Sequence, residues 1–218
     1  MKYFSKERIS GFNIHYDLYT LDYFLDCQAK LGIKNVELLA GHQALYVDYN
    51  GHCDAKAVKK KLDDRGLHCA VLAPENCCFQ YQFAAKDPLL KERSFQYFKN
   101  SMHLGAELGA KLMQANSGWG FWNEDKEEAL KRSAEMHRRL CDVAEELDMT
   151  IACETLRPQE SLIGYKVEDL KRLFDMVNHP RFKVMIDITA MAVSGEIVDA
   201  KTLALVLKVA RLAAEKKL

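Results

Sequence analysis

Short apolar runs alternate along this chain with segments in which apolar residues recur at helical spacing. This alternation is typical of strand–helix units on a parallel sheet, because strands covered on both faces need continuous apolar runs. The predicted strands are residues 11–15, 35–39, 68–73, 111–115, 150–154 and 183–187. Six strands in this pattern indicate the α/β class.

The helical segments between these strands end in a repeated way. Glycine closes them at Leu31-Gly32, Arg65-Gly66 and Leu108-Gly109, and each glycine leads into a strand. A glycine here adopts the left-handed conformation that ends a helix, so the three exits mark one repeated unit. The sequence therefore predicts a TIM-barrel-like (β/α) repeat: about six parallel strands with outer helices, incomplete relative to the (β/α)8 barrel.

The length of 218 residues suits one barrel-like domain with a distinct final segment. Residues 1–197 are predicted to form the partial barrel. Residues 198–218 are rich in Ala, Leu and Lys and lack Gly and Pro, which predicts a helix that packs on the barrel or mediates assembly. Because an open sheet leaves unpaired backbone groups at its edges, we expect a homo-oligomer formed through the sheet edges or this helix.

The charge balance and the cysteines narrow the class of partner. Lys+Arg and Asp+Glu both number 31, so the net charge is zero. This gives no electrostatic reason to expect nucleic acid or a membrane as partner. The seven cysteines form no CxxC pair, and no apolar run reaches the roughly 18 residues of a membrane span. We expect a reduced, cytoplasmic protein with a small-molecule substrate.

Two carboxylates stand at the ends of predicted strands. Glu154 closes the run Ile151-Ala152-Cys153, and Asp187 closes the run Val184-Met185-Ile186. The carboxyl ends of parallel strands meet at the face where α/β barrels place their chemistry, so two acids there could share one divalent cation. Alternatively, such acids cap nearby helices or remain solvated. The pattern offers Glu154 and Asp187 as metal ligands.

A polar loop follows the first of these carboxylates. It contains Arg157 and, six residues after Glu154, a second acid at Glu160. A loop that lies over the mouth of a barrel could direct both side chains at the hydroxyl groups of a substrate. The alternative is an ordinary solvated loop. We treat Arg157 and Glu160 as candidate substrate-binding residues.

Three further candidates lie at other strand exits. Trp119 belongs to the aromatic loop 116–123, which suits packing against a sugar ring but could equally plug the barrel mouth or meet a partner subunit. His42 and Glu75 follow the second and third predicted strands. Lone residues of this kind line pockets in some proteins and are structural in others, so both interpretations stay open.

Several of these motifs together resemble a known family. They are the six strand–helix units, Val36-Glu37-Leu38-Leu39, Ser117-Gly118-Trp119-Gly120, Glu154 followed by Glu160, and Val184-Met185-Ile186-Asp187. In these the chain resembles the sugar phosphate isomerase/epimerase family, which has a xylose isomerase-like TIM barrel. It is most similar to the tagatose/fructoselysine 3-epimerase group. The resemblance runs from about residue 10 to about residue 197 and covers nearly every unit.

The resemblance implies a metal-dependent site. In that family a divalent cation, often manganese, is bound by Glu, Asp, His and Glu from strands five to eight, and the two glutamates also act as the acid/base pair. By position, Glu154 is similar to the first glutamate and Asp187 to the aspartate. Glu160 is similar to the residue that contacts the sugar near O1 and O2. The implied cofactor is Mn²⁺, with Mg²⁺ or Co²⁺ as alternatives.

The chain departs from the family pattern at two points. Many relatives carry a histidine three residues after the strand-six aspartate, where this chain has Ala190. The strand-seven histidine and the strand-eight glutamate find no counterpart in the sequence. We therefore expect a barrel that retains the first two metal ligands and needs others from elsewhere, for example from a partner chain.

Two hypotheses about function follow. The first is a sugar (phosphate) isomerase or epimerase that uses a divalent metal and a glutamate acid/base through an enediolate. The second is a non-catalytic, truncated or re-engineered barrel that acts as a folding or assembly module. An endonuclease of the abasic-site type is disfavoured, because the exits of strands three and four lack histidine and the net charge is zero.

Overall fold

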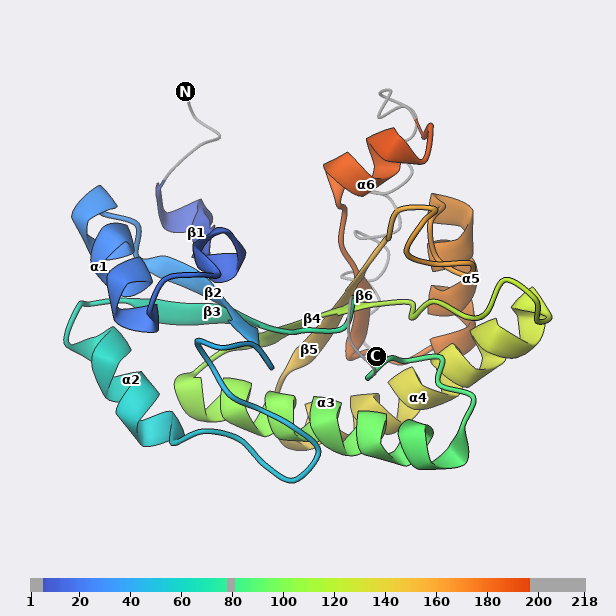
Figure 1. Cartoon of the computed structure of the whole chain (residues 1–218), viewed down its shortest axis with the longest axis horizontal. Coiled ribbons are helices and arrows are strands. Elements are labelled where there is room, and N and C mark those ends of the chain that lie inside the picture. Colours follow the sequence, from blue (N-terminus) through green and yellow to red (C-terminus); the bar gives the residue numbers. More distant parts are fainter. Residues whose placement is uncertain (1–5, 78–80, 197–218) are drawn as a thin grey trace. The chain divides into compact units, whose positions relative to one another are not determined.

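The computed structural model describes residues 6–77 and 81–196, in which strands and helices alternate (Figure 1). The strands are β1 (Ser10–Phe12), β2 (Asn35–Ala40), β3 (His68–Pro74), β4 (Leu112–Asn116), β5 (Thr150–Glu154) and β6 (Phe182–Val184). The helices are α1 (Leu21–Leu31), α2 (Ala55–Asp63), α3 (Pro88–Leu108), α4 (Lys126–Glu146), α5 (Val167–Val177) and α6 (Ile188–Val193). Two short 3-10 turns, η1 (Lys6–Arg8) and η2 (Asn13–Tyr16), flank β1.

The six strands form one sheet in the order β1-β2-β3-β4-β5-β6. The pairs β1–β2, β2–β3, β3–β4 and β5–β6 are parallel, so helical crossovers connect successive strands. Within the described ranges β1 and β6 are the two ends of this order, and the sheet is not closed. The predicted fold class, a TIM-barrel-like repeat of about six parallel strands with outer helices, is confirmed.

The first strand is shorter than predicted. Instead of residues 11–15, β1 covers Ser10–Phe12, and Asn13 begins the turn η2. The reason is a contact with the next strand: the Asn13 side-chain oxygen accepts a hydrogen bond from the Leu39 backbone N–H at 2.7 Å. Asn13 is buried, so this bond satisfies a polar group that would otherwise be costly. The chain leaves the strand conformation at Asn13, where this hydrogen bond forms.

The last strand also ends earlier than predicted. Instead of residues 183–187, β6 covers Phe182–Val184, and Asp187 is the N-cap of α6. The Asp187 carboxylate accepts hydrogen bonds from the backbone N–H groups of Thr189 at 2.8 Å and Ala190 at 3.0 Å. Capping of this kind begins a helix and so ends the extended conformation. The prediction that Asp187 closes the strand itself was wrong by three residues.

The helix ends follow the local signals in the sequence. Asp54 caps α2 by accepting a hydrogen bond from the Ala57 N–H at 3.1 Å, and Asp87 does the same for the Leu90 N–H at 2.8 Å. Gly32 ends α1 with a left-handed φ of +70°. Such caps stabilise helix ends by about 1 kcal/mol each. Gly66 and Gly109 also have the predicted left-handed φ, at +63° and +91°, although α2 itself ends at Asp63, with Asp64 as its C-cap.

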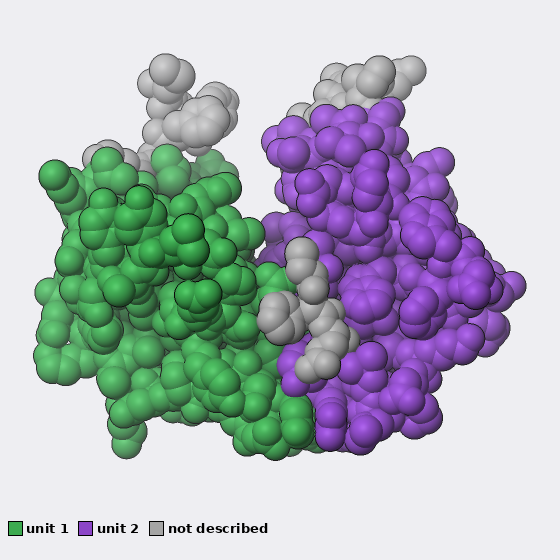
Figure 2. Space-filling model, in the orientation of Figure 1, with its two compact units in different colours: residues 1–75, 96–113, 147–149 green, residues 76–95, 114–146, 150–218 purple. Residues whose placement is uncertain are grey.

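The chain divides into two compact units, shown in different colours in Figure 2. Unit 1 comprises residues 1–75, 96–113 and 147–149, and unit 2 comprises residues 76–95, 114–146 and 150–218. Fully buried core residues of unit 1 include Leu25, Val36, Leu38, Leu62 and Leu72. Those of unit 2 include Phe83, Met136, Leu140, Ile151 and Phe182. The assignment of residues 1–197 to one domain stays a prediction, and the helix predicted for residues 198–218 lies outside the described residues.

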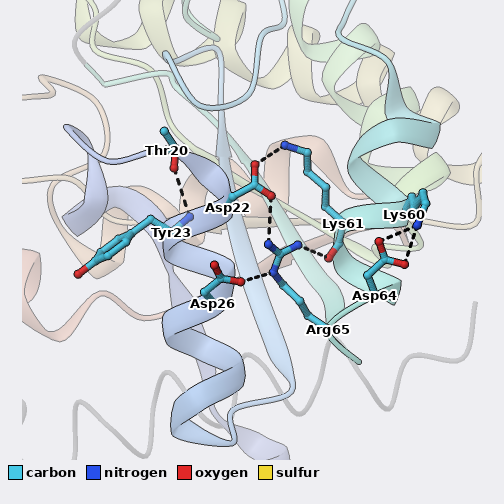
Figure 3. A network of polar contacts seen from close by, with 8 residues as sticks. All are labelled: Thr20, Asp22, Tyr23, Asp26, Lys60, Lys61, Asp64 and Arg65. Carbon is cyan, nitrogen blue, oxygen red and sulfur yellow. Dashed lines mark hydrogen bonds and ion pairs between the residues drawn. The ribbon is translucent and has the colours of Figure 1, made fainter.

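Helices α1 and α2 of unit 1 are joined by a network of ion pairs (Figure 3). Arg65 donates from Nε to Asp26 at 2.6 Å and from Nη2 to Asp22 at 3.2 Å, and Lys61 also pairs with Asp22. The hydrogen bond from Lys61, with the charge of Arg65, lowers the pKa of Asp22. Because these groups are partly exposed, each pair contributes only a few tenths of a kcal/mol up to about 1 kcal/mol.

Two further properties of the described residues concern membrane-spanning helices and disulfide bonds. None of their helices is long and apolar enough to span a bilayer. Their six cysteines are all free thiols.

Candidate functional site

The carboxylate of Glu154 lies at the end of β5, beside a carboxamide of β4. Alternation along β4 places Gln114 on the opposite face from Met113 and Ala115, which are fully buried. β4 and β5 are neighbours in the sheet, and the Gln114 Nε2 donates a hydrogen bond to Glu154 Oε1. The hydrogen bond from Gln114 on the neighbouring strand thus orients the carboxylate at the carboxyl end of β5, in unit 2.

The loop that follows β5 holds a second carboxylate in a charged environment. Arg157 donates to Glu160 from its guanidinium and, at 2.8 Å, from its backbone N–H. The Cys77 thiol donates to Glu160 Oε1 at 3.4 Å. Burial alone would raise the pKa of Glu160, but the hydrogen bonds from Arg157 and Cys77 lower it below its ordinary value. Glu160 is therefore held as an ionised hydrogen-bond acceptor.

Asp187 has different partners from Glu160. The hydrogen bond with Glu160 raises the pKa of Arg157, and the negative charge of Asp187 adds a smaller contribution to the same shift. The guanidinium of Arg157 binds Glu160, whereas the Asp187 carboxylate is bound by the backbone N–H groups of Thr189 and Ala190.

The loop after β4 is bound to the loop after β5. The Trp119 carbonyl accepts a hydrogen bond from the Leu162 N–H at 2.7 Å, and the Ser161 hydroxyl donates to the Gly118 carbonyl at 2.7 Å. Ser161 is almost fully buried, so these bonds are shielded from water. The backbone around Trp119 is thereby fixed to the segment that carries Glu160.

The aromatic side chains of this loop differ in exposure. Trp122 is 70% exposed and Phe121 is 48% exposed. Trp119 is half-buried, and its indole Nε1 is buried with no hydrogen-bond partner among the residues that the structure describes. Whether Trp119 binds a substrate therefore stays a prediction.

Gly118 is a position where substitution should have a large effect on stability. Its φ is +74°, and a Cβ there would lie 2.7 Å from the Ala84 backbone nitrogen. We expect Gly118→Ala to lower the free energy of unfolding by about 2–4 kcal/mol, from the left-handed conformation and the backbone clash together. Urea denaturation measures the loss.

Gly195 provides the matched control for this substitution. Its φ is also positive, at +71°, but a Cβ would meet no atom of the described residues within 4 Å. Gly195→Ala should therefore cost only the conformational part, about 1 kcal/mol. Equal losses in the two variants would contradict a role for the close approach at Gly118.

The two sequence candidates of unit 1 are His42 and Glu75. His42 Nδ1 lies 2.6 Å from Asp17 Oδ1, and the Glu75 carbonyl accepts a hydrogen bond from the Tyr97 hydroxyl at 2.9 Å. On β2, burial raises the pKa of Glu37 to about 7. A carboxyl that titrates near neutrality is a common feature of functional sites. The roles of His42 and Glu75 in substrate binding stay predictions.

We compared the chain with known barrel proteins, because it has their strand order and crossovers and carries acids at the strand ends. A family model described as xylose isomerase-like TIM barrel matches residues 26–215, which is most of the chain. The chain belongs to this family. Membership fixes the fold and the end of the sheet at which relatives carry their sites. It leaves the chemistry of this xylose isomerase-like barrel to be argued from its own residues.

The most informative relatives of this xylose isomerase-like barrel are sugar epimerases. Fructoselysine 3-epimerase of Escherichia coli O157:H7 is 23% identical over 168 residues, 77% of this chain and 61% of that enzyme. The enzyme of the same name from Shigella flexneri is 22% identical over the same length. The chain thus spans about three-fifths of the length of the curated relatives it matches.

Solved structures give the same fold. A D-psicose 3-epimerase crystallised in the presence of D-fructose has a TM-score of 0.73 at 17% identity, covering 90% of this chain and 68% of that one. A 3-keto-D-glucoside 4-epimerase from E. coli has a TM-score of 0.74 at 14% identity, covering 94% and 76%. At these identities the likeness shows the fold alone.

The fit of a metal to this barrel can be tested on its own donors. Glu154 and Asp187 offer carboxylate oxygens, the ligand type that Mn²⁺ and Mg²⁺ prefer. However, one oxygen of Asp187 is engaged by two backbone N–H groups, and residues 6–77 and 81–196 contain no group of three or more His, Cys, Asp or Glu placed to hold a metal. The donor chemistry fits a divalent cation, whereas the described donors do not complete its site.

Two residues of the site were missed by the sequence analysis. Gln114 interrupts an apolar strand, and period-two alternation places it on the same face as Asn116, so a signal for it was present. Cys77 contacts Glu160 from 83 positions earlier in the sequence, and nothing local indicates that contact. Both depend on which strands become neighbours.

Proposed function

We propose that this chain is a sugar isomerase or epimerase unit that moves a proton at the carbon beside a ketose carbonyl, with Glu154 as the base. The observation that carries the proposal is the carboxylate of Glu154, oriented by Gln114 at the carboxyl end of the sheet. Membership of the xylose isomerase-like family supports it, as do the names of the relatives, which are 3-epimerases.

The proposed step is a simple proton transfer. The Glu154 carboxylate removes the proton beside the carbonyl, the electron pair of the broken C–H bond enters the enediolate, and Glu154 becomes the acid. Return of the proton to the same carbon from the opposite face gives the epimer, whereas protonation of the neighbouring carbon gives the isomer. Inversion therefore requires a second acid on the far face.

Glu160 and Arg157 suit a different task. Because Arg157 keeps Glu160 ionised, Glu160 accepts hydrogen bonds from sugar hydroxyls and is poorly suited to remove a weakly acidic proton. Trp119 is a further proposed substrate-binding residue of unit 2, and His42 and Glu75 are proposed substrate-binding residues of unit 1. The substrate class is a ketose or its phosphate.

A divalent metal, Mn²⁺ with Mg²⁺ or Co²⁺ as alternatives, is part of the proposal. Glu154 and Asp187 would hold it, with further ligands from outside the described residues or from a partner chain. When bound, such an ion polarises the carbonyl and stabilises the enediolate charge. Glu154, Asp187 and their hydrogen-bond donors are the part of that centre that this chain contributes.

Self-association and location complete the proposal. The sheet of the described residues is not closed, and we propose on this basis a homo-oligomer in which an edge of the sheet pairs with a second copy. The six free thiols agree with a reducing compartment, so we propose a cytoplasmic location.

Arg157→Gln tests the role given to the loop. Without the guanidinium, Glu160 loses its charged donor, and we expect KM for the ketose to rise about tenfold while kcat changes less than about threefold. Steady-state kinetics measures both. Arg172→Gln, which breaks the exposed pair with Glu127, is the matched control and should leave KM unchanged. A fall in kcat alone for Arg157→Gln would contradict a binding role.

The function itself is tested by product analysis. The purified chain, loaded with Mn²⁺, is incubated with D-fructose, D-tagatose and fructoselysine, and the products are separated by chromatography. Conversion of any of these ketoses to its C3 epimer or aldose isomer supports the proposal. A folded chain that converts none of them would favour the alternative, a non-catalytic barrel.

A further inference from the structure

Gln114 is a polar residue inside a strand of the described part of the sheet. It is a half-buried carboxamide in β4, between the fully buried Met113 and Ala115. A polar side chain placed inside a strand costs free energy unless it is hydrogen-bonded. Its Nε2 is satisfied by Glu154 Oε1 on the adjacent strand. The hydrogen bond to Glu154, the proposed base, therefore offsets the free-energy cost of placing Gln114 inside the strand.

We propose that Gln114 is a positioning residue: it fixes the rotamer of Glu154 and directs Oε2 toward the substrate and the metal. The inference rests on the proposed function. A glutamate has three rotatable side-chain bonds, so a carboxylate at a strand end samples many orientations unless a neighbour holds one oxygen. Anchoring Oε1 on the β4 side leaves one defined direction for Oε2. Preorganisation of this kind is what a metal ligand or a general base requires.

The chemical type of the donor matters as much as its place. A carboxamide donates a hydrogen bond without carrying charge, so Gln114 orients Glu154 without itself neutralising the carboxylate. Arginine or lysine in the same place would neutralise part of that charge. Glu160, by comparison, is held by the guanidinium of Arg157.

A second carboxamide on the same face of β4 shows what a structural role looks like. Asn116 donates to the Asn76 side-chain oxygen and accepts a hydrogen bond from the Gly118 N–H at 2.8 Å. Both asparagines are buried, and their bonds join the exits of two strands. Gln114 instead reaches a titratable side chain at a strand end. Asn116 therefore has a structural role in joining two loops, whereas Gln114 binds a side chain that we propose to be functional.

The test compares manganese binding by the whole chain and by Gln114→Met. Methionine keeps the length and volume of glutamine and removes the N–H donor. We expect the Kd for Mn²⁺, measured by electron paramagnetic resonance titration, to rise about 10- to 100-fold, with an unchanged thermal midpoint. Gln43→Met makes the same chemical change at an exposed position of unit 1 and should leave the Kd unchanged.

Each outcome of the titration has one meaning. Weaker binding by Gln114→Met alone supports the positioning role. Equal binding by Gln114→Met and the parent chain overturns the role while leaving the proposed function intact. No binding by the folded parent chain overturns the proposed metal centre, and the positioning role with it.

A second measurement covers the case in which Gln114→Met does not fold. In the parent chain, one side-chain amide proton of Gln114 should resonate downfield in the NMR spectrum, as expected for a donor to a carboxylate. It should move upfield in Glu154→Leu. An amide resonance that is the same in the two folded proteins would show that the contact is absent and would overturn the proposal.

Discussion

Replacing Glu154 by glutamine is expected to slow proton exchange at the carbon beside a ketose carbonyl by about a thousandfold. Glutamine keeps the length and shape of the side chain, and its carbonyl oxygen can still accept the hydrogen bond from Gln114. It cannot take up the substrate proton as a carboxylate can. Loss of deuterium transfer from the solvent to the ketose, followed by NMR, measures the effect.

The control for this substitution is a glutamate of the same unit that lies away from the strand ends. Glu146 is exposed at the end of α4, so the Glu146→Gln variant should catalyse deuterium exchange into the ketose at the rate of the parent chain. A Glu154→Gln chain that retains more than about a tenth of the parent rate would contradict the assignment of the base. The carboxylate would then have to be sought elsewhere on the sheet.

The second large effect concerns stability against acid. His137 is fully buried in unit 2, with its ring stacked on Phe83 at a centroid distance of 4.4 Å and edge-on to Phe182 at 4.9 Å. Its Nδ1 lies 2.8 Å from the Ser133 carbonyl, which assigns the proton of the neutral ring to Nδ1. Burial lowers the pKa of His137 to about 4, although the Ser133 carbonyl opposes the shift in part.

The sign of the pH dependence follows from this lowered pKa. In the unfolded chain a histidine titrates near pH 6.5, so between about pH 6.5 and pH 4 the unfolded state binds a proton that the folded state does not. The contribution of His137 to the free energy of unfolding is complete above about pH 6.5 and is lost as the pH falls toward 4. Over this range the free energy of unfolding falls by about 3 kcal/mol.

His137→Gln should remove this dependence, because glutamine does not titrate. We expect the free energy of unfolding, measured with urea at intervals from pH 7.5 to pH 4, to fall by about 3 kcal/mol less in His137→Gln than in the parent chain. His68→Gln, at an exposed position that begins β3, is the control and should follow the parent curve. Parallel curves for His137→Gln and the parent would contradict the account.

The fold was predictable from the sequence because its signals are local. Apolar runs define the strands, and Gly32 and Asp54 end and begin helices through contacts within a few residues. His137 also follows a local rule, since it shares a helix face with Leu140 and Ser133 at three- and four-residue spacing. The order of the strands then follows from their succession in the chain.

The predicted ends of β1 and β6 were wrong because a side-chain hydrogen bond to backbone ended each strand early. Asn13 leaves the strand conformation because its side chain binds Leu39, 26 residues away. Asp187 follows an apolar run that reads as one strand, but its side chain begins a helix instead. In both cases a short polar side chain bonded to backbone and ended the extended segment.

The candidate site was predictable only in part. The strand-end position of Glu154 could be identified from the apolar run before it. Its hydrogen bond with Gln114 depends on the pairing order of β4 and β5, and the contact of Cys77 with Glu160 on the folding of a loop. Such contacts between residues far apart in sequence require the structure.

The measurement that tests the central claim most directly is solvent exchange by the parent chain itself. The protein is incubated with Mn²⁺ and D-fructose, D-tagatose or fructoselysine in D₂O, and deuterium at the carbon beside the carbonyl is followed by NMR. The account predicts deuterium uptake by at least one of these ketoses, whether or not inversion follows. No uptake by any of them, with a chain shown to be folded, would contradict the assignment of Glu154 as a base acting on a ketose.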